Sequence, residues 1–231
     1  MAVESKPAQY AVFKKIFFIS FWIYCFCASC LWALINPFVI LWLGKERTIS
    51  NAIVLVLIIE FYIKGMQSPI TTFRTSCGLF VQGKYRPLIM ALINITVSVI
   101  LVQIMGITGV ILGTIISQVS TQFWYDPYLV FKEVFNRSLW AYMKRYIVYF
   151  SVTVCCCISS QALSSLINLN NLYLNFVCRL FVCAILPNII ILLLFHRTNE
   201  FKEVMLLVKN VVRRFKSRSR LSKERCRKES A

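Results

Sequence analysis

The chain has 231 residues, of which 58% are hydrophobic and 15% are charged. A water-soluble domain of this length keeps a larger charged share, about 25%, so the composition excludes an ordinary globular domain. The net charge is +17, and the Lys and Arg residues responsible for it cluster between apolar blocks and at the C-terminus. That distribution is typical of membrane topology and argues against a nucleic-acid-binding protein.

The apolar residues come in blocks of about 20, the length that a helix needs to cross the hydrocarbon core. They predict an all-α, polytopic membrane helix bundle with six transmembrane helices: Ile16–Ile35, Ile49–Phe73, Leu88–Met105, Ile107–Val130, Tyr146–Leu166 and Leu172–Phe195. The first block is too long for a signal peptide. Asn36-Pro37 predicts a bend or break at its outer end.

The predicted domains are a cytoplasmic segment over residues 1–15, a transmembrane domain over 16–196 and a basic cytoplasmic tail over 197–231. Basic connectors stay inside, and an N-in, C-in topology places ten Lys and Arg residues there besides the tail: Lys6, Lys14, Lys15, Arg74, Lys84, Arg86, Lys132, Arg137, Lys144 and Arg145. The outer connectors then hold only two, Lys45 and Arg47.

Two opposite charges lie inside the second predicted span. Glu60 is about 17 Å into this helix at 1.5 Å per residue, and Lys64 follows one turn later on the same face. One interpretation is an ion pair that lowers the cost of burial. The other is a carboxylate that couples transport to a cation or proton, because an ionisable residue inside the membrane is a functional candidate by default.

Three further charges are candidates for substrate or ion coupling. Asp126, which precedes Pro127, is expected to reach the cytoplasmic interface. Arg179 lies one to two turns inside the outer end of the last span, where it either snorkels outward or draws an anionic headgroup. Arg74 is expected at the cytoplasmic mouth of a cavity, where a guanidinium suits bidentate phosphate contact; a topology anchor is the stronger interpretation.

A stripe of small residues, Gly109, Gly113 and Ser117, repeats every four positions in the fourth predicted span and indicates close helix packing. Past Arg197, apolar residues recur at near-helical spacing from Phe201 to Phe215. This pattern predicts an amphipathic helix on the anionic inner leaflet, followed by a disordered basic end. An inside-positive anchor is a compatible, simpler interpretation.

The sequence predicts no enzyme, cofactor or metal site. The ten cysteines are expected as free thiols, mostly buried within spans. The chain has no GxxxxGK[ST] phosphate loop, and its single histidine, His196, has no catalytic partner nearby in sequence.

An ordered set of segments resembles the polysaccharide repeat-unit flippases of the multidrug/oligosaccharidyl-lipid/polysaccharide exporter superfamily. The core is FYI..M..PI..FR...GLF...KY.PL over Phe61–Leu88. The flanking segments are FWIYCF and LINPFVILWLG upstream, with GITGVILGTIIS and WYDPYLVFKEVF downstream. Arg74 belongs to the FR of this pattern. The resemblance covers roughly residues 10 to 150.

The resemblance implies a two-lobe transporter that moves undecaprenyl-diphosphate-linked oligosaccharide across the bacterial cytoplasmic membrane by alternating access. The six spans match the second lobe only, so the chain is expected to be a partial one: a fragment, a truncated gene product, or a half-transporter whose partner is a separate N-terminal lobe or a second copy. Two alternatives remain: a drug or cation exporter of the same superfamily, and a non-transporting membrane scaffold for glycan assembly.

Overall fold

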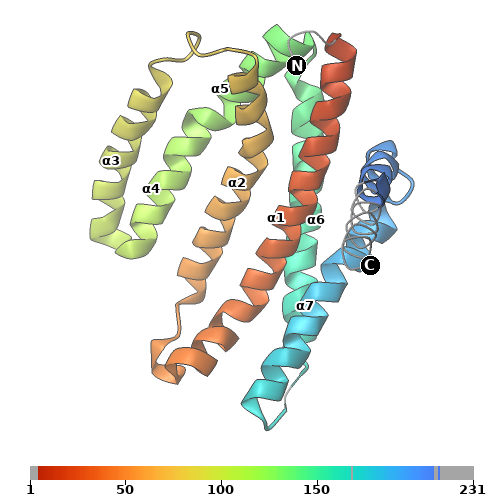
Figure 1. Cartoon of the computed structure of the whole chain (residues 1–231). Coiled ribbons are helices and arrows are strands. Elements are labelled where there is room, and N and C mark those ends of the chain that lie inside the picture. The colour runs from red at the N-terminus through yellow and green to blue at the C-terminus, as the bar shows by residue number, and fades with distance from the viewer. Residues whose placement is uncertain (1–4, 168, 211–212, 214–231) are drawn as a thin grey trace, which may run out of the picture.

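The computed structural model describes residues 5–167, 169–210 and 213, and every regular element in them is a helix (Figure 1). In chain order they are α1 (Lys6–Leu43), η1 (Lys45–Arg47), α2 (Asn51–Ser76), α3 (Arg86–Met105), α4 (Ile107–Ser120), α5 (Gln122–Leu129), η2 (Val130–Phe135), α6 (Leu139–Ser165) and α7 (Leu172–Phe195). A further helix, the tail helix, covers residues 199–210.

Five helices in the described part of the chain are long and apolar enough to cross a membrane: α1, α2, α3, α6 and α7. The predicted fourth span, 107–130, is not a single helix. It divides at Thr121 into α4 and α5 and continues into the π-helix η2. The Thr121 hydroxyl donates to the Ser117 carbonyl oxygen at 2.6 Å, a bond of the kind that bends helices. The six-span count therefore stays a prediction.

The first helix is longer at both ends than its predicted span. It begins at Lys6 and runs through Pro37 to Leu43, so the expected end at Ile35 is wrong and the helix has no break at Asn36-Pro37. Asn36 supports this region, because its side-chain oxygen accepts a hydrogen bond from the Ile49 amide at 3.0 Å. Gly44, with φ 89°, ends the helix in a conformation that a residue with a Cβ rarely adopts.

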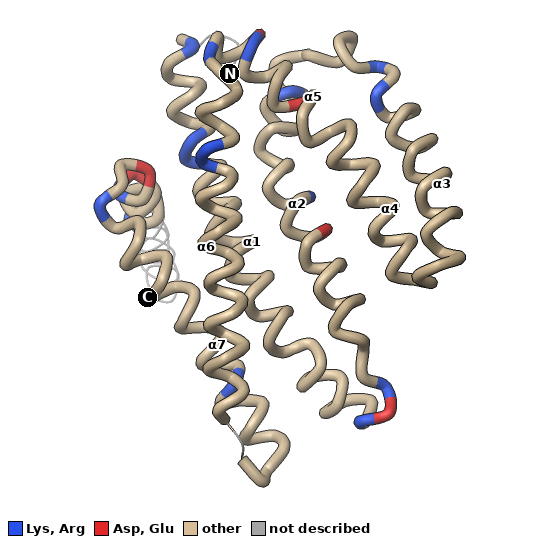
Figure 2. The backbone as a smooth tube through the Cα atoms, turned by 180° about the vertical axis from the view of Figure 1, so that it is seen from behind, with Lys and Arg blue, Asp and Glu red and all other residues tan. Residues whose placement is uncertain are grey.

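The connections gather at two ends of the bundle. The N-terminus of α1, the 77–85 connection and η2 lie at one end, here called the N-terminal end; η1 and the α6–α7 connection lie at the opposite end (Figure 1). Most Lys and Arg residues of the described part of the chain lie in the N-terminal half of the bundle (Figure 2). The α3–α4 turn stops short of the opposite end, so the far halves of α1 and α2 extend beyond it (Figure 1).

Aromatic rings form the main core in the N-terminal half of the bundle. Phe13, Phe17, Phe18 and Phe21 of α1 are buried against rings from α2, η2, α6 and α7. The closest stacked pair, Phe21 and Tyr149, has ring centroids 4.2 Å apart. Such rings fill the space between helices with rigid side chains. This half of the bundle therefore has a well-packed core against which the neighbouring elements lie.

The small-residue stripe of α4 lies where α3 approaches. A Cβ on Gly109 would lie 2.2 Å from the Leu101 carbonyl oxygen, and one on Gly113 would lie 2.2 Å from the Ser98 hydroxyl oxygen. Ser117 is fully buried. Because α3 has no buried residue of its own and packs chiefly on α4, these glycines set how closely it is held.

The tail helix packs against α1 and α6 in the described residues. Phe201 stacks on Trp22, with ring centroids 5.7 Å apart, and Glu200 accepts a hydrogen bond from Arg145 at 2.6 Å. Two lysines of α1 add ion pairs, Lys14 with Glu200 at 3.7 Å and Lys15 with Glu203 at 3.1 Å. The predicted disordered basic end, 214–231, lies outside the described residues.

Glu200 is ionised against these cations. Burial acts to raise the pKa of its carboxyl, but hydrogen bonds from its own backbone and from Arg145, with the charges of Arg145 and Lys14, bring that pKa below its ordinary value. The docked tail helix is therefore held in part by a carboxylate that stays charged at neutral pH.

Candidate functional site

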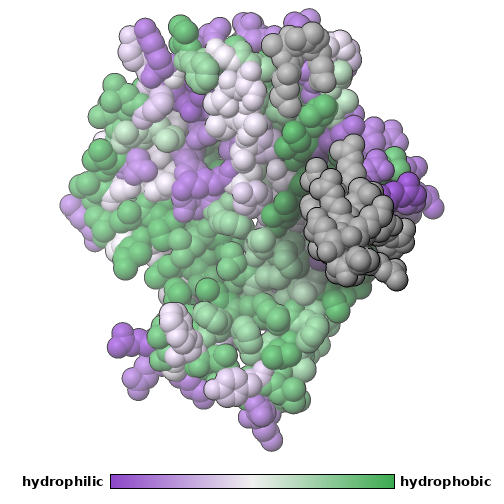
Figure 3. Space-filling model, viewed as in Figure 1, coloured by the Kyte–Doolittle hydropathy of each residue, from purple (hydrophilic) through white to green (hydrophobic). Residues whose placement is uncertain are grey.

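Polar side chains gather on the face of the bundle over α2 and α4 (Figure 3). A cavity of about 210 Å³ opens there. This cavity, called the polar pocket below, is lined by Ile63, Lys64, Gln67, Ser68, Thr71, Thr72, Gln118, Gln122 and Phe123. Three of these nine residues are glutamines and three carry hydroxyl groups, which makes the pocket rich in neutral hydrogen-bonding groups.

Gln67 is the least satisfied of the glutamines. Its residue is 5% exposed, and neither its Nε2 nor its Oε1 has a hydrogen-bond partner. Gln118 is also buried, whereas Gln122 donates from Nε2 to the Thr71 hydroxyl at 3.4 Å. A buried amide without partners costs free energy, so Gln67 is a candidate ligand-binding group.

Two hydroxyl groups of α2 that line the pocket give their protons to the helix backbone. Thr71 donates to the Gln67 carbonyl oxygen at 3.2 Å, and Thr72 donates to the Ser68 carbonyl oxygen at 2.9 Å. A hydroxyl that gives its proton to the backbone keeps lone pairs for a further partner. The pocket wall therefore offers both donors, from the amides, and acceptors, from amides and hydroxyls.

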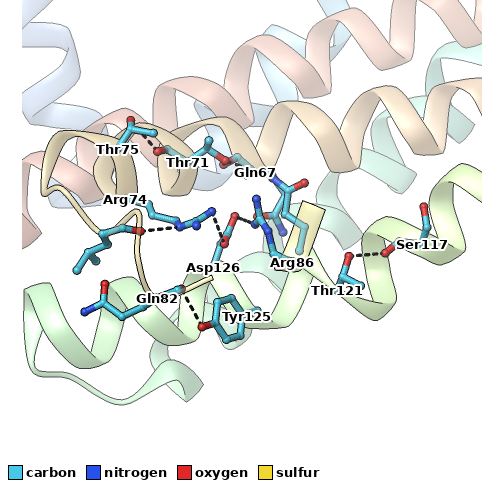
Figure 4. Close-up of polar contacts among 12 residues, drawn as sticks. Gln67, Thr71, Arg74, Thr75, Gln82, Arg86, Ser117, Thr121, Tyr125 and Asp126 are labelled. Carbon is cyan, nitrogen blue, oxygen red and sulfur yellow. Dashed lines mark hydrogen bonds and ion pairs between the residues drawn. The ribbon is translucent and has the colours of Figure 1, made fainter. Parts of the chain in front are cut away.

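One turn nearer the N-terminal end, three charged residues from α2, α3 and α5 meet (Figure 4). This arginine cluster consists of Arg74, Arg86 and Asp126. The Arg74 guanidinium lies 3.2 Å from the Asp126 carboxylate, and Arg86 donates to the other carboxylate oxygen. Asp126 is fully buried, and two guanidinium groups compensate its carboxylate inside the protein. Its position at the membrane interface stays a prediction.

The arginine cluster also fastens the 77–85 connection. Arg74 donates from Nε to the Leu79 carbonyl oxygen at 3.2 Å, and the Tyr125 hydroxyl donates to the Gln82 carbonyl oxygen at 2.8 Å (Figure 4). Gly83, at φ 140°, has room for no Cβ, which would lie 2.9 Å from the Tyr125 ring. The connection is thus tied to α2 at Leu79 and to α5 at Gln82, just before this glycine.

The cluster carries one positive charge in excess, since two guanidinium groups face a single carboxylate. The Arg86 Nε is buried without a hydrogen-bond partner. Guanidinium groups with spare donors suit planar, multidentate contact with phosphate or carboxylate. The sequence predicts Arg86 only as one of the cations that set membrane topology. Arg86 reaches Asp126 because the α2–α3 connection folds back onto α5, and no local sequence pattern indicates that fold.

Glu60 and Lys64 form the ion pair that their spacing predicts, at 2.9 Å. The Lys64 side chain is 65% exposed and that of Glu60 is 19% exposed. Lys64 borders the polar pocket and also a second cavity of about 390 Å³, which Glu60 lines together with mostly apolar residues of α1 and α2. The pair therefore lies between a polar and an apolar hollow.

Arg179 lies away from these residues, near the opposite end. It donates to the Asn175 side-chain oxygen at 3.0 Å and to the Ile167 carbonyl oxygen at 2.9 Å. These bonds tie the first turns of α7 to the α6–α7 connection. Of the five charged candidates, the structure thus brings Glu60, Lys64, Arg74 and Asp126 to one side of the bundle and leaves Arg179 apart.

The three glutamines of the pocket were missed because neutral polar residues are tolerated in membrane helices far better than charges. A signal for them exists in the spacing. Lys64, Ser68 and Thr72 recur every four residues, and Gln67 with Thr71 forms a second such row beside them. Two adjacent rows at helical spacing indicate one polar helix face.

Neither protein-family models, nor curated proteins, nor solved structures give a match to this chain.

Proposed function

We propose that the chain is a lobe of a transporter that moves undecaprenyl-diphosphate-linked oligosaccharide repeat units across the bacterial cytoplasmic membrane for surface polysaccharide synthesis. The resemblance over residues 61–88 and its flanking segments supports this proposal, as do five helices long and apolar enough to cross a membrane. In the proposed N-in, C-in topology, the N-terminal end of the bundle faces the cytoplasm.

The observation that carries the proposal is the polar pocket beside the arginine cluster. A hydrated sugar diphosphate crosses a bilayer slowly because its polar groups lose water in hydrocarbon. A row of amides and hydroxyls on membrane helices replaces that water, and adjacent guanidinium groups compensate the diphosphate charge. The lipid tail of such a substrate stays in the bilayer while its headgroup follows the polar helix face.

Lys64 supports a second lobe or a second copy on the same face. Its ammonium lies on α2, between the two cavities, and its side chain is 65% exposed. A charge exposed to lipid tails is expensive, and such residues face a bundle interior or a wet cavity instead. We infer that a partner lobe covers this face and encloses the pocket, the arginine cluster and the Glu60–Lys64 pair.

The test is deletion of the gene in the cell that encodes it. The expected result is loss of surface polysaccharide and accumulation of lipid-linked repeat units in the inner leaflet, both restored by the full chain. Restoration should fail with Arg74→Gln and succeed with Arg47→Gln, a matched change in η1 at the opposite end.

Other outcomes separate the alternatives. Unchanged polysaccharide together with lost resistance to cationic drugs would favour the exporter. Loss of function on deleting only residues 213–231 would favour the scaffold, because the pocket and cluster described here do not include those residues.

A further inference from the structure

We propose that the polar pocket is a binding site for one neutral sugar ring, with Gln67, Gln118 and Gln122 as its hydrogen-bonding residues. This inference rests on the proposed function and names the part of the substrate that α2, α4 and α5 contact. It assigns the pocket a role distinct from that of the arginine cluster, which suits the phosphate groups.

The hydrogen-bonding capacity of the pocket matches a carbohydrate. Each sugar hydroxyl both donates and accepts, and so does each glutamine amide, which offers two protons and one carbonyl oxygen. Gln67 presents all of these unused, because its buried Nε2 and Oε1 have no partner. A ring hydroxyl that bonded this amide would remove the cost of leaving it unpaired.

The charge of the lining disfavours cationic ligands. Lys64 is the single charged residue among the nine that line the pocket, and no carboxylate lines it. The two nearest in sequence are both paired with cations: Glu60 with Lys64 at 2.9 Å, and Asp126 with Arg74 and Arg86. A cationic drug would lie beside an ammonium group with no counterion in the lining, so the pocket disfavours it. The hydroxyl groups of an uncharged polyol can hydrogen-bond to the amides and hydroxyls of the lining.

Size and shape point to a single ring. The volume of about 210 Å³ is below the roughly 300–1,000 Å³ of pockets that hold drug-sized ligands. Phe123 supplies one aromatic wall, held by edge contact with Tyr146 at 5.0 Å between ring centroids. An aromatic wall among hydrogen-bonding groups gives the apolar C–H face of a sugar ring a surface to cover.

The pocket and the arginine cluster are consecutive on the same elements. On α2, Arg74 follows Thr71 by three residues, and on α5, Asp126 follows Gln122 by four, in each case about one helical turn of 5.4 Å. A sugar ring in the pocket therefore has guanidinium groups one turn away, toward the N-terminal end. This order matches a sugar that is linked to a phosphate.

Saturation-transfer NMR on the full chain in lipid nanodiscs tests the site, with maltotriose as the neutral probe and tetramethylammonium as a cation of comparable solubility. We expect saturation transfer to maltotriose and none to tetramethylammonium. Gln67→Leu should weaken maltotriose binding by about tenfold, the effect of losing one or two neutral hydrogen bonds. Gln161→Leu, the same change at an exposed position of α6, should leave it unchanged.

A second variant guards against misfolding. Ser68 is exposed at the pocket, so Ser68→Phe fills the pocket without disturbing the aromatic core, and it should abolish binding while the amides remain. Equal maltotriose signals in all variants, or no signal in the unaltered chain, would overturn the inference. If the chain does not bind maltotriose but is still needed for surface polysaccharide, only the sugar site is contradicted. If the chain binds maltotriose but deletion of its gene leaves surface polysaccharide unchanged, only the proposed function is contradicted.

Discussion

Asp126 shows how a single carboxylate orders three elements. It is fully buried, and each of its oxygens faces one arginine, from α2 and from the start of α3. Burying three charges is costly, but removing one partner costs more, because it leaves charge without compensation. The 77–85 connection consequently depends on a residue more than forty positions away.

We predict that Asp126→Asn destabilises the chain by about 3 kcal/mol or more, because Arg74 and Arg86 then face each other without a counterion. The measurement is the thermal unfolding midpoint in detergent micelles. Glu133→Gln makes the same change at an exposed position of η2 and should have little effect. Adding Arg86→Gln to Asp126→Asn should recover part of the loss. Equal unfolding midpoints for Asp126→Asn and Glu133→Gln would contradict the prediction.

The same residues show what sequence reasoning finds at a site. Intramembrane charge is expensive, so Glu60, Lys64, Arg74 and Asp126 stand out in an apolar sequence. The pairing of Glu60 with Lys64 follows from helical spacing, and the structure has it at 2.9 Å. Arg86 and Gln67 did not stand out, because one needs a loop to fold back and the other carries no charge.

Among the helices, predictability follows local hydrophobicity. The predicted span Leu172–Phe195 coincides with α7, and the predicted Leu88–Met105 lies within α3. The predicted span 107–130 is not one helix, because two contacts shape its second half. Asp126 joins the arginine cluster through tertiary ion pairs, and the Thr121 hydroxyl bonds locally to the Ser117 carbonyl oxygen. Neither contact has a signature in hydropathy.

The tail helix gives a prediction at this scale. The pKa of Glu200 is lowered when the helix is docked, so its contribution to docking is present above the ordinary glutamate pKa of about 4.3. That contribution is lost as pH falls through the lowered value. Docking should therefore be insensitive to pH from about 8 to 5 and weaken below about 4.

Hydrogen exchange of residues 199–210 at a series of pH values measures docking, after correction for the intrinsic exchange rate. At pH 7, Glu200→Gln should raise exchange in this segment, because Arg145 and Lys14 lose their anionic partner. Glu46→Gln, in η1 at the opposite end, should not. Protection that falls steadily between pH 8 and 5 would count against Glu200 as the group responsible.

For the whole molecule, the distribution of charge predicts sidedness more simply than any contact does. Lys and Arg residues are concentrated toward the N-terminal end of the bundle, and Lys45 and Arg47 lie in η1 at the other (Figure 2). The inside-positive rule then orients every helix at once. What the sequence could not predict is the open side of the bundle, meaning the face where the polar pocket and the exposed Lys64 lie, because this face depends on how α2 packs against α4 and α5.

That open side leads to the last prediction. The polar pocket and the 65% exposed Lys64 are costly against lipid, so transport should require a covering lobe. Expressed alone in a cell that lacks its own polysaccharide flippase, the chain should insert but restore no surface polysaccharide.

Reporter fusions control for insertion: one at Gly83 should report the cytoplasm and one at Leu169 the outside. With both reporters so placed, restored polysaccharide from this chain alone would contradict the need for a partner, whereas reversed reporters would contradict the orientation on which the proposed function depends.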